Sequence, residues 1–252
     1  MTGSSLVTGL FGRLAEPFTA EGVFDCLAGV VYFVKNERAE YVVVNRTLAE
    51  RCGTQDKRTL LGKTAAQAFP PPFGRSFWEQ DMRLIASGQP VLNQLELHLY
   101  PTGLTGWCLT NKFPLRGSGD VIVGLVGVSH DLHPPNESAE EYNSVAAAVR
   151  HARAHLDRRL VTEDLAVIAG LSAYQFDQRV RRLFRLSTGQ LLLKLRMDSA
   201  AEQLRDTDSP VVEVGMGCGY ADQSAFTRQF RRTTGMTPGE YRRTFRPLAT
   251  DE

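Results

Sequence analysis

The sequence of 252 residues has few cysteines and no long hydrophobic run. Its cysteines are far apart and form no CxxC pair, which argues against a disulfide framework or a zinc site and predicts a reducing cytoplasm: Cys26, Cys52, Cys108 and Cys218. No apolar stretch approaches the roughly 18 residues that a membrane-spanning helix needs, so no membrane partner is expected. The opening MTGSSLVTGLFGRLAEPF has no basic region followed by an apolar core, so we expect no secretory signal there.

Patterns typical of catalysis and of metal binding are missing as well. His130 with His133, and His151 with His155, have spacings that metal sites use, but a third ligand at a fixed spacing is absent. The glycine-rich GMGCG of residues 215–219 is not part of a strand-to-helix turn of the dinucleotide-binding type. With no nucleophile–base set either, we expect no enzyme and no metal, and the sequence leaves any cofactor unknown.

Lysine is scarce in the second half of the chain, where arginine replaces it. Residues 141–252 hold 17 basic residues against 14 acidic ones, and Lys194 is the one lysine among them. Residues 1–140 hold 12 basic residues against 14 acidic ones. The planar arginine fork suits bidentate contacts to phosphates and guanine edges, although this modest charge excess fits an ordinary solvated helical surface equally well.

A polar, proline-containing segment separates two kinds of hydrophobic pattern. Before the HPPNESAEE of residues 133–141, short β-branched runs predict five strands: two in residues 30–45, then 90–101, 107–115 and 121–129. A helix-leaning stretch from Thr47 to Ser87, broken by three prolines, lies between the second and third strands. This order predicts an α+β fold with a five-stranded antiparallel sheet and helices.

Helical periodicity dominates after that segment. The expected helices are 141–156, 162–168, 173–184, 188–205, 211–217, 223–232 and 238–245. Thr162, Ser172 and Asp222 are of the residue types that cap helix N-termini. We therefore expect a lead-in at 1–19, an α+β domain at 20–133, a linker at 134–141, an all-α domain at 142–247 and a tail at 248–252.

The helical half repeats itself at an offset of about 50 residues. LSAYQFDQRVRRLFRLST (171–188) aligns with ADQSAFTRQFRRTTGMTP (221–238), so that Phe176 matches Phe226. Each unit consists of a short helix, a turn near Gly170 or Gly219 and a second amphipathic helix, which is a helix-turn-helix used twice. The helix at 188–205 is expected to act as a rigid spacer between the two units.

The second helix of a helix-turn-helix lies in the DNA major groove and presents one face to base edges. The side chains expected on these faces can pair with bases or stack on them, unlike uniformly charged ones. They are Tyr174, Gln175, Asp177, Gln178 and Arg181 in the first unit and Gln223, Ser224, Thr227 and Arg228 in the second. Asp177 has two expected roles: accepting a hydrogen bond from a cytosine amine, or orienting a neighbouring arginine.

Residues 142–246 resemble the DNA-binding domain of AraC-type transcription regulators. The resemblance is strongest in DQSAFTRQFRRTTGMTPGEYR (222–242), which follows the family pattern D-x-S-x-F-x-R-x-F and then T/S-P-x-x-Y-R. The first unit departs from the family because Val180 stands where it has Phe and Arg185 where it usually has Gly. Arg185 must therefore end its helix in another way, unless the helix runs on. The resemblance implies that both recognition helices contact successive major-groove segments of double-stranded DNA.

Residues 20–133 resemble a PAS sensor domain, from the opening strand GVVYFVKN to the closing VGLVGVSHDL. The cysteine context of flavin-binding light sensors is absent, because Arg46 follows the asparagine of VNRTLAERC. His98 is the candidate axial ligand for a haem, but the alternation of leucines around it predicts an exposed histidine instead. Trp78 and Trp107 are candidates for a pocket lining or for ordinary aromatic core packing. A small organic effector and a purely dimerising role both remain open.

Together these patterns predict a cytoplasmic, sequence-specific regulator of transcription whose PAS-like domain senses a small molecule or mediates dimerisation. The expected partners are an operator in double-stranded DNA, a second copy of the chain, a small effector and, as a candidate, RNA polymerase. The alternative is a PAS-based redox or chromophore sensor whose helical half is a protein-interaction module. The sequence does not reveal the operator, the effector or the sign of regulation.

Overall fold

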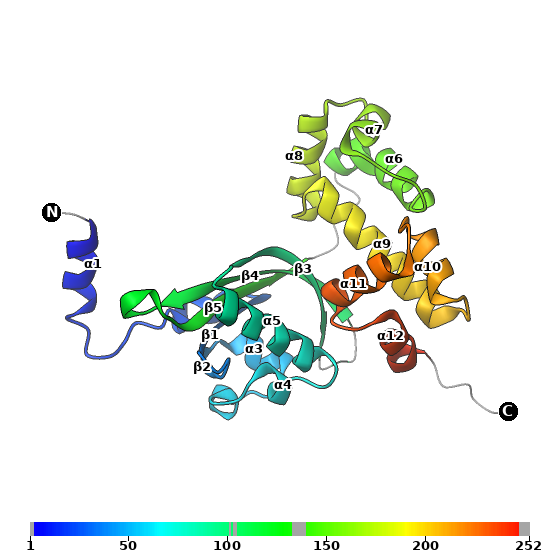
Figure 1. Ribbon diagram of the computed structural model, residues 1–252. Helices are drawn as coiled ribbons and strands as arrows, with labels where there is room; N and C mark the ends of the chain where they lie inside the picture. The colour runs from blue at the N-terminus through cyan, green and yellow to red at the C-terminus, as the bar shows by residue number, and fades with distance from the viewer. Residues whose placement is uncertain (1–2, 101, 103–104, 133–139, 247–252) are drawn as a thin grey trace.

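The computed structural model describes residues 3–100, 102, 105–132 and 140–246. An α+β region comes first along the chain and an all-helical region follows it, side by side in Figure 1. This fold class is the predicted one. The expected tail at 248–252 and residues 134–139 of the expected linker lie outside the described residues. Among the residues that are described, no helix is both long and apolar enough to cross a membrane.

The sheet of the first region is antiparallel throughout and has the strand order β2-β1-β5-β4-β3. Its strands are β1 (Val30–Asn36), β2 (Tyr41–Val44), β3 (Val91–Leu99), β4 (Thr105–Arg116) and β5 (Ile122–Asp131). The five strands that the β-branched runs predict are therefore confirmed. The first and last strands of the region lie side by side in the middle of the sheet, because β1 pairs with β5 from Val30↔His130 to Asn36↔Gly124.

Short helices between β2 and β3 cover one face of this sheet (Figure 1). They are α3 (Arg46–Arg51), η1 (Lys57–Leu60), α4 (Ala65–Ala68) and α5 (Phe73–Ser87), while α2 (Glu21–Asp25) precedes β1. Side chains alternate across a strand, so Val31 and Phe33 of β1 point to the same face and pack there with Leu48 and Leu84 of the helices. Asn45 starts α3 by accepting a hydrogen bond from the backbone N–H of Leu48.

Charged side chains also lie inside this α+β layer. Asp81 of α5 is fully buried between two lysines of the sheet, Lys35 and Lys112, and both ammonium groups ion-pair with its carboxylate. Burial lowers the pKa of Lys35 to about 8, against the opposing pull of Asp81. A buried charge needs a partner, so this triad fixes α5 against the sheet.

The helices of the second region agree closely with those predicted. They are α6 (Glu140–Ala154), α7 (Thr162–Ile168), α8 (Ala173–Phe184), α9 (Thr188–Asp206), α10 (Val211–Gly217), α11 (Gln223–Thr234) and α12 (Pro238–Phe245). One capping expectation is wrong: Thr162 is the first helical residue of α7, and Val161 occupies the cap position without a side-chain hydrogen bond. The first turn of α7 instead carries Glu163 and Asp164, whose charges favour a helix N-terminus.

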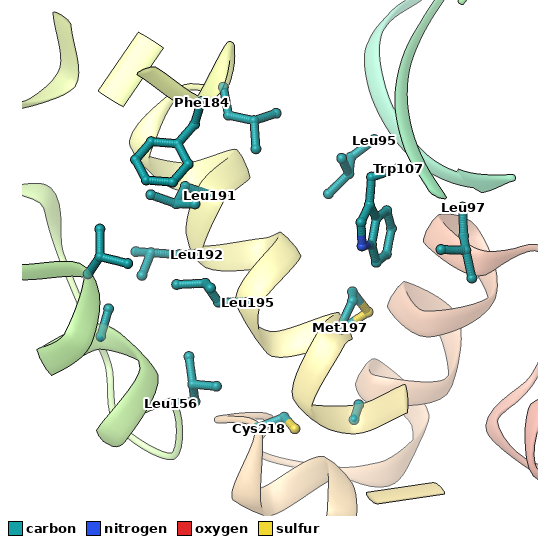
Figure 2. Packing of buried hydrophobic residues seen from close by; sticks show 14 of the residues in the cluster. Leu95, Leu97, Trp107, Leu156, Phe184, Leu191, Leu192, Leu195, Met197 and Cys218 are labelled. Carbon is teal, nitrogen blue, oxygen red and sulfur yellow. The ribbon is translucent and has the colours of Figure 1, made fainter. Parts of the chain in front are cut away.

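One hydrophobic core runs through the helical region and continues onto the outer face of the sheet. Leu191, Leu192 and Leu195 of α9 lie in the middle of this core, as Figure 2 shows. Leu95 and Leu97 of β3 belong to the same cluster, together with Trp107 and Leu109 of β4. Both faces of the β3–β4 hairpin are therefore covered, one by the helices of its own region and the other by the helical region.

The expected lead-in at residues 1–19 contains a helix, α1 (Gly3–Phe11). In Figure 1, α1 stands apart from the sheet and from the other helices. Its apolar side chains at Val7, Leu10 and Phe11 are exposed. The sequence predicted only a lead-in here, because the nine residues of α1 carry no charge and give no clear amphipathic signal.

Candidate nucleic-acid interface

Two helix-turn-helix units stand at the two ends of α9: α7 with α8, and α10 with α11 (Figure 1). Each turn contains a glycine in the left-handed region, Gly170 with φ 66° and Gly219 with φ 79°. A Cβ on Gly219 would lie 2.4 Å from the carbonyl oxygen of Leu156, so this turn has no room for a side chain. The two turns that the repeat predicts are therefore both formed.

Polar side chains fix where the second helix of each unit begins. Ser172 accepts a hydrogen bond from the backbone N–H of Gln175, whose side chain in turn accepts from the Ser172 N–H. Asp222 accepts from the backbone N–H of Ala225 at 2.7 Å. Such caps contribute about 1 kcal/mol each. The capping roles expected of Ser172 and Asp222 are confirmed.

Aromatic packing fixes which face of each second helix is buried. Phe226 and Phe230 of α11 are fully buried, and their ring centroids lie 5.5 Å apart. The Phe226 ring packs so closely on α10 that a Cβ on Gly215 would meet it at 3.0 Å. In α8 the corresponding buried residues are Phe176 and Val180. The opposite face of each helix is thereby left to solvent.

The exposed face of α11 carries the four side chains that the sequence singles out. Gln223, Ser224 and Arg228 are exposed, and Thr227 is half-buried. Among the described residues, the Arg228 guanidinium has no hydrogen-bond or ion-pair partner. Amide, hydroxyl and guanidinium groups on one exposed face can donate to and accept from base edges, so this face has the chemistry that base recognition needs.

The exposed face of α8 divides into free and engaged side chains. Tyr174 is 74% exposed, and Gln178 is exposed as well. The side chain of Gln175 takes part in the cap of its own helix. Arg181 donates from its Nε to Asp177 at 2.6 Å. Tyr174 and Gln178 are therefore the side chains of this face that the structure leaves free.

Asp177 makes one contact that the sequence did not indicate, with Thr188 at the start of α9. Its Oδ1 accepts from both the backbone N–H of Thr188, at 2.8 Å, and the Thr188 hydroxyl, at 2.9 Å, while its Oδ2 accepts from Arg181. Burial would raise the pKa of this carboxyl, but the bonds from Thr188 and Arg181 lower it. Asp177 thus ties α8 to the start of α9, and its bond to Arg181 is the contact that the second of its two expected roles requires.

The spacer helix α9 holds the two units in a fixed relation. Met197, Ala200 and Leu204 are fully buried in the common core. Arg196 donates from its Nη2 to the carbonyl oxygen of Arg158 at 3.0 Å, which joins α9 to the segment after α6. Because the helix is continuous from Thr188 to Asp206, the recognition faces of α8 and α11 cannot move independently.

The far end of α11 contacts the α+β region, which sequence reasoning missed. Arg231 ion-pairs with Glu79 of α5 at 3.0 Å, and the Nε of Arg232 donates to the Oε1 of Gln94 in β3 at 3.1 Å. Nearby, the indole N–H of Trp107 donates to Asp198 of α9 at 2.7 Å. The leucine alternation of β3 was the one sequence signal for this contact. It indicates that one face of the strand is covered, but not which part of the chain covers it.

His98 corrects another expectation, because it is buried rather than exposed. Only 7% of its surface is accessible, and it lies with Glu96 inside the α+β layer. Its Nδ1 accepts from the Arg51 guanidinium at 3.1 Å. Burial alone would raise the pKa of Glu96, but the neighbouring His98, Lys112 and Thr110 lower it to about 2. The prediction failed because the polar face of β3 points inward and its leucine face meets the helical region.

Glu96, His98 and Cys108 form the one cluster in the described part of the chain whose ligand atoms lie close enough to hold a metal, all within 4.8 Å. These atoms already have protein partners. Glu96 accepts from Gln80 at 2.5 Å and from Thr110 at 2.6 Å, and the arginine beside His98 places a positive charge next to the cluster. The group therefore works as a hydrogen-bonded core of the α+β layer.

Comparison with known proteins matches both regions of the chain. The family described as "PAS fold" matches residues 27–134, and the family described as "Helix-turn-helix domain" matches residues 165–244. The regulatory protein SoxS of Salmonella typhimurium is 32% identical over 88 residues, an alignment that covers 35% of this chain and 82% of SoxS. The transcriptional activator RclR of Escherichia coli is 40% identical over 87 residues, which is 34% of this chain and 31% of RclR.

A third relative is the MmsAB operon regulatory protein of Pseudomonas aeruginosa, 31% identical over 115 residues, or 46% of this chain and 36% of the relative. The chain thus spans about a third of the length of this protein and of RclR. Among solved structures, the C-terminal domain of AraT from Geobacillus stearothermophilus is 27% identical and covers 45% of this chain and 95% of that one, with a TM-score of 0.42.

The family assignment depends on the sequence matches and not on that structural score. The match to SoxS extends over most of the relative's length, and the helix-turn-helix match contains both units built on α9. A PAS fold precedes them in the same chain. The chain belongs to the AraC family of transcription regulators.

Proposed function

We propose that the protein is a sequence-specific DNA-binding regulator that reads two successive major-groove segments with α8 and α11. The observation that carries this proposal is the pair of capped recognition helices with exposed polar faces, held at fixed separation by α9. A protein that bound only phosphates would need no particular amide or hydroxyl side chains on these helices. Arginines near both faces supply the electrostatic share of the affinity, which falls as salt concentration rises.

Within this proposal the expected contact residues have different roles. Gln223, Ser224, Thr227 and Arg228 read one base block, and Tyr174 and Gln178 read the other. Asp177 positions Arg181. Gln175 stabilises the start of α8 through its capping hydrogen bond. Arg181 then contacts a phosphate or a base edge while Asp177 restrains its side chain.

Selection of bound sequences from a random DNA pool at moderate salt tests the proposal. The full chain is expected to enrich a motif with two base blocks centred about 10 base pairs apart, one turn of the double helix. A single enriched block would mean that only one unit reads bases. Binding without any enrichment would contradict sequence-specific recognition.

We propose that the PAS-like region regulates the helical region in response to a small molecule. The support is the contact between the two regions: the β3–β4 hairpin shares a core with α9, and α5 pairs with α11 through Glu79 and Arg231. We divide the chain into a PAS-like domain at 20–133, a linker at 134–141 and a DNA-binding domain at 142–247. As a regulator of this kind it acts in the cytoplasm, with RNA polymerase as a further partner.

We also propose that the protein is a homodimer in which α1 packs on a second copy. Val7, Leu10 and Phe11 leave an apolar helix surface uncovered in a single chain, with Leu10 60% exposed. Light scattering is expected to give twice the mass of the chain for the wild type and the single mass for Leu10→Asp. Arg13→Ala changes a nearby exposed residue and is expected to leave the dimer intact. A monomeric wild type would contradict the proposal.

A further inference from the structure

A cleft of about 600 Å³ separates the PAS-like region from the second recognition helix. Residues of α5 and of the start of β3 line one side of it, and residues of α11 line the other. Figure 1 shows α11 beside the α+β region. Binding sites for small organic molecules commonly have volumes of about 300–1,000 Å³. The cavity beside Lys35, Glu96 and His98, inside the PAS-like layer, is only about 20 Å³, enough for a single water molecule.

Positive charge from both regions gathers in this cleft. Four arginines line it, against the two acidic residues Glu79 and Glu96: Arg83 from α5, and Arg228, Arg231 and Arg232 from α11. Glu79 already pairs with Arg231, and the oxygens of Glu96 accept from Gln80 and Thr110. Within the part of the chain that the structure describes, the guanidinium groups of Arg83 and Arg228 have no ion-pair or hydrogen-bond partner. Two guanidinium groups in the cleft are therefore available to bind an anion.

An apolar wall lies beside these charges. Phe77 of α5 lines the cleft together with Pro90, Val91 and Leu92 at the start of β3. Leu92 is 56% exposed there. Guanidinium groups bind phosphates and carboxylates bidentately, and an apolar wall beside them favours a ligand whose remaining body is apolar.

We infer that this cleft is an effector site for an organic oxyanion, a small molecule with an apolar body and a phosphate or carboxylate group held by Arg83 and the arginines of α11. The ligand joins the two regions, because Arg83 belongs to one and Arg228 to the other. Neither region alone offers both the apolar wall and the complete set of arginines.

The inference rests on the proposed function in one respect, which is that Arg228 reads DNA. An oxyanion held by Arg228 withdraws that guanidinium from the base-reading face and fixes α11 against the PAS-like region. Effector binding and operator binding therefore oppose each other, and by linkage each weakens the other by the same factor.

Calorimetric titration of the full-length protein with 1-naphthyl phosphate tests the site without DNA. This probe combines an apolar body with a phosphate, whereas 1-naphthol lacks the charge and inorganic phosphate lacks the body. We expect 1-naphthyl phosphate to bind at least tenfold more tightly than either comparison compound. Equal affinity for all three compounds, or no binding of the first, would overturn the inference.

Two variants locate the bound probe. Arg83→Ala is expected to weaken 1-naphthyl phosphate binding at least tenfold, because Arg83 is the arginine that the PAS-like region contributes to the cleft. Arg13→Ala removes the same charge from an exposed position outside the cleft and should leave binding unchanged. Equal effects of the two substitutions would mean that the anion responds to net charge alone, and the site would be refuted.

A second measurement separates this site from the DNA-contacting surface. Saturating 1-naphthyl phosphate is expected to weaken binding of wild-type protein to its selected DNA at least fivefold, but to have little effect on Arg83→Ala. If the anion lowers the DNA affinity of both proteins by the same factor, it competes at the DNA-contacting surface itself and the cleft is not its site. If no DNA sequence is selected at all, the proposed function fails while the calorimetric test still decides the cleft.

Discussion

Arg185 and Gly235 occupy the same place in the two repeated units, and both adopt the left-handed backbone conformation. Arg185 ends α8 with φ 59°, and Gly235 ends α11 with φ 80°. Each donates its backbone N–H back into its helix, to the carbonyl oxygens of Arg181 and Arg231 respectively. The arginine therefore ends the first recognition helix as the glycine ends the second, and the helix does not run on.

The first prediction follows from the difference between these two residues. A side chain in the left-handed conformation costs roughly 1–2 kcal/mol, whereas glycine adopts it freely but loses more chain entropy on folding. Arg185→Gly is therefore expected to raise the free energy of unfolding by about 1 kcal/mol, measured by urea denaturation. Arg150→Gly, at an exposed helical position of α6, should lower it by about 1 kcal/mol. If Arg185→Gly also lowered the free energy of unfolding, the left-handed backbone of Arg185 would not be a source of strain.

The second prediction concerns base reading by Arg228. Losing a bidentate contact to a base weakens binding by about 1–3 kcal/mol, and only for DNA that has that base at the contacted position. Arg228→Ala should weaken binding to the selected DNA by that amount, relaxing specificity at one position, with a smaller loss on random DNA. Fluorescence anisotropy with labelled duplexes measures both. Arg150→Ala is the charge-matched control on α6, and equal losses on both duplexes for Arg228→Ala would rule out a base contact.

A third prediction separates the two roles considered for Asp177. Its carboxylate accepts from the backbone and hydroxyl of Thr188, so removal leaves two donors at the start of α9 without their acceptor. Asp177→Ala should lower the free energy of unfolding by about 1–3 kcal/mol. Asp157→Ala, at an exposed position before α7, should change it by less than about 0.5 kcal/mol. A variant of unchanged stability with altered base preference would assign Asp177 to DNA instead.

The fourth prediction is a pH dependence that arises from Lys35. Its pKa is about 8 in the folded protein, below the ordinary lysine value of 10.5, so above pH 8 the unfolded chain binds the additional proton. Stability then rises with pH, by about 1 kcal/mol between pH 8 and 9. Buried thiols such as Cys108, whose pKa is raised, oppose this rise at higher pH.

Comparison with a variant isolates the contribution of the lysine. Lys35→Met keeps the ion pair between Asp81 and Lys112 and removes the titrating group. The difference in unfolding free energy between wild type and variant, from denaturation at several pH values, should grow by about 1 kcal/mol from pH 8 to 9. A difference that stays constant over this range would mean that Lys35 keeps its proton.

Local patterns predicted the helices and strands, but not how the two regions meet. The repeat placed α8 and α11 correctly because Phe176, Phe226 and the turn glycines are local signals. His98 was misassigned because alternation shows that a strand has two unlike faces without showing what covers each one. The contact of Glu79 with Arg231 spans 152 positions in the sequence, and no local pattern contains it.

The fifth prediction tests the division between the two regions. Most of the core around α9 comes from residues after 141, and the α+β region adds Phe73, Leu95, Leu97, Trp107 and Leu109. A fragment of residues 141–252 should therefore unfold cooperatively on heating, at a lower temperature than the full chain because the surface that these side chains cover becomes exposed. It should also select the same DNA motif. Circular dichroism checks folding first, and an unfolded fragment would show that the helical region needs the PAS-like region to fold.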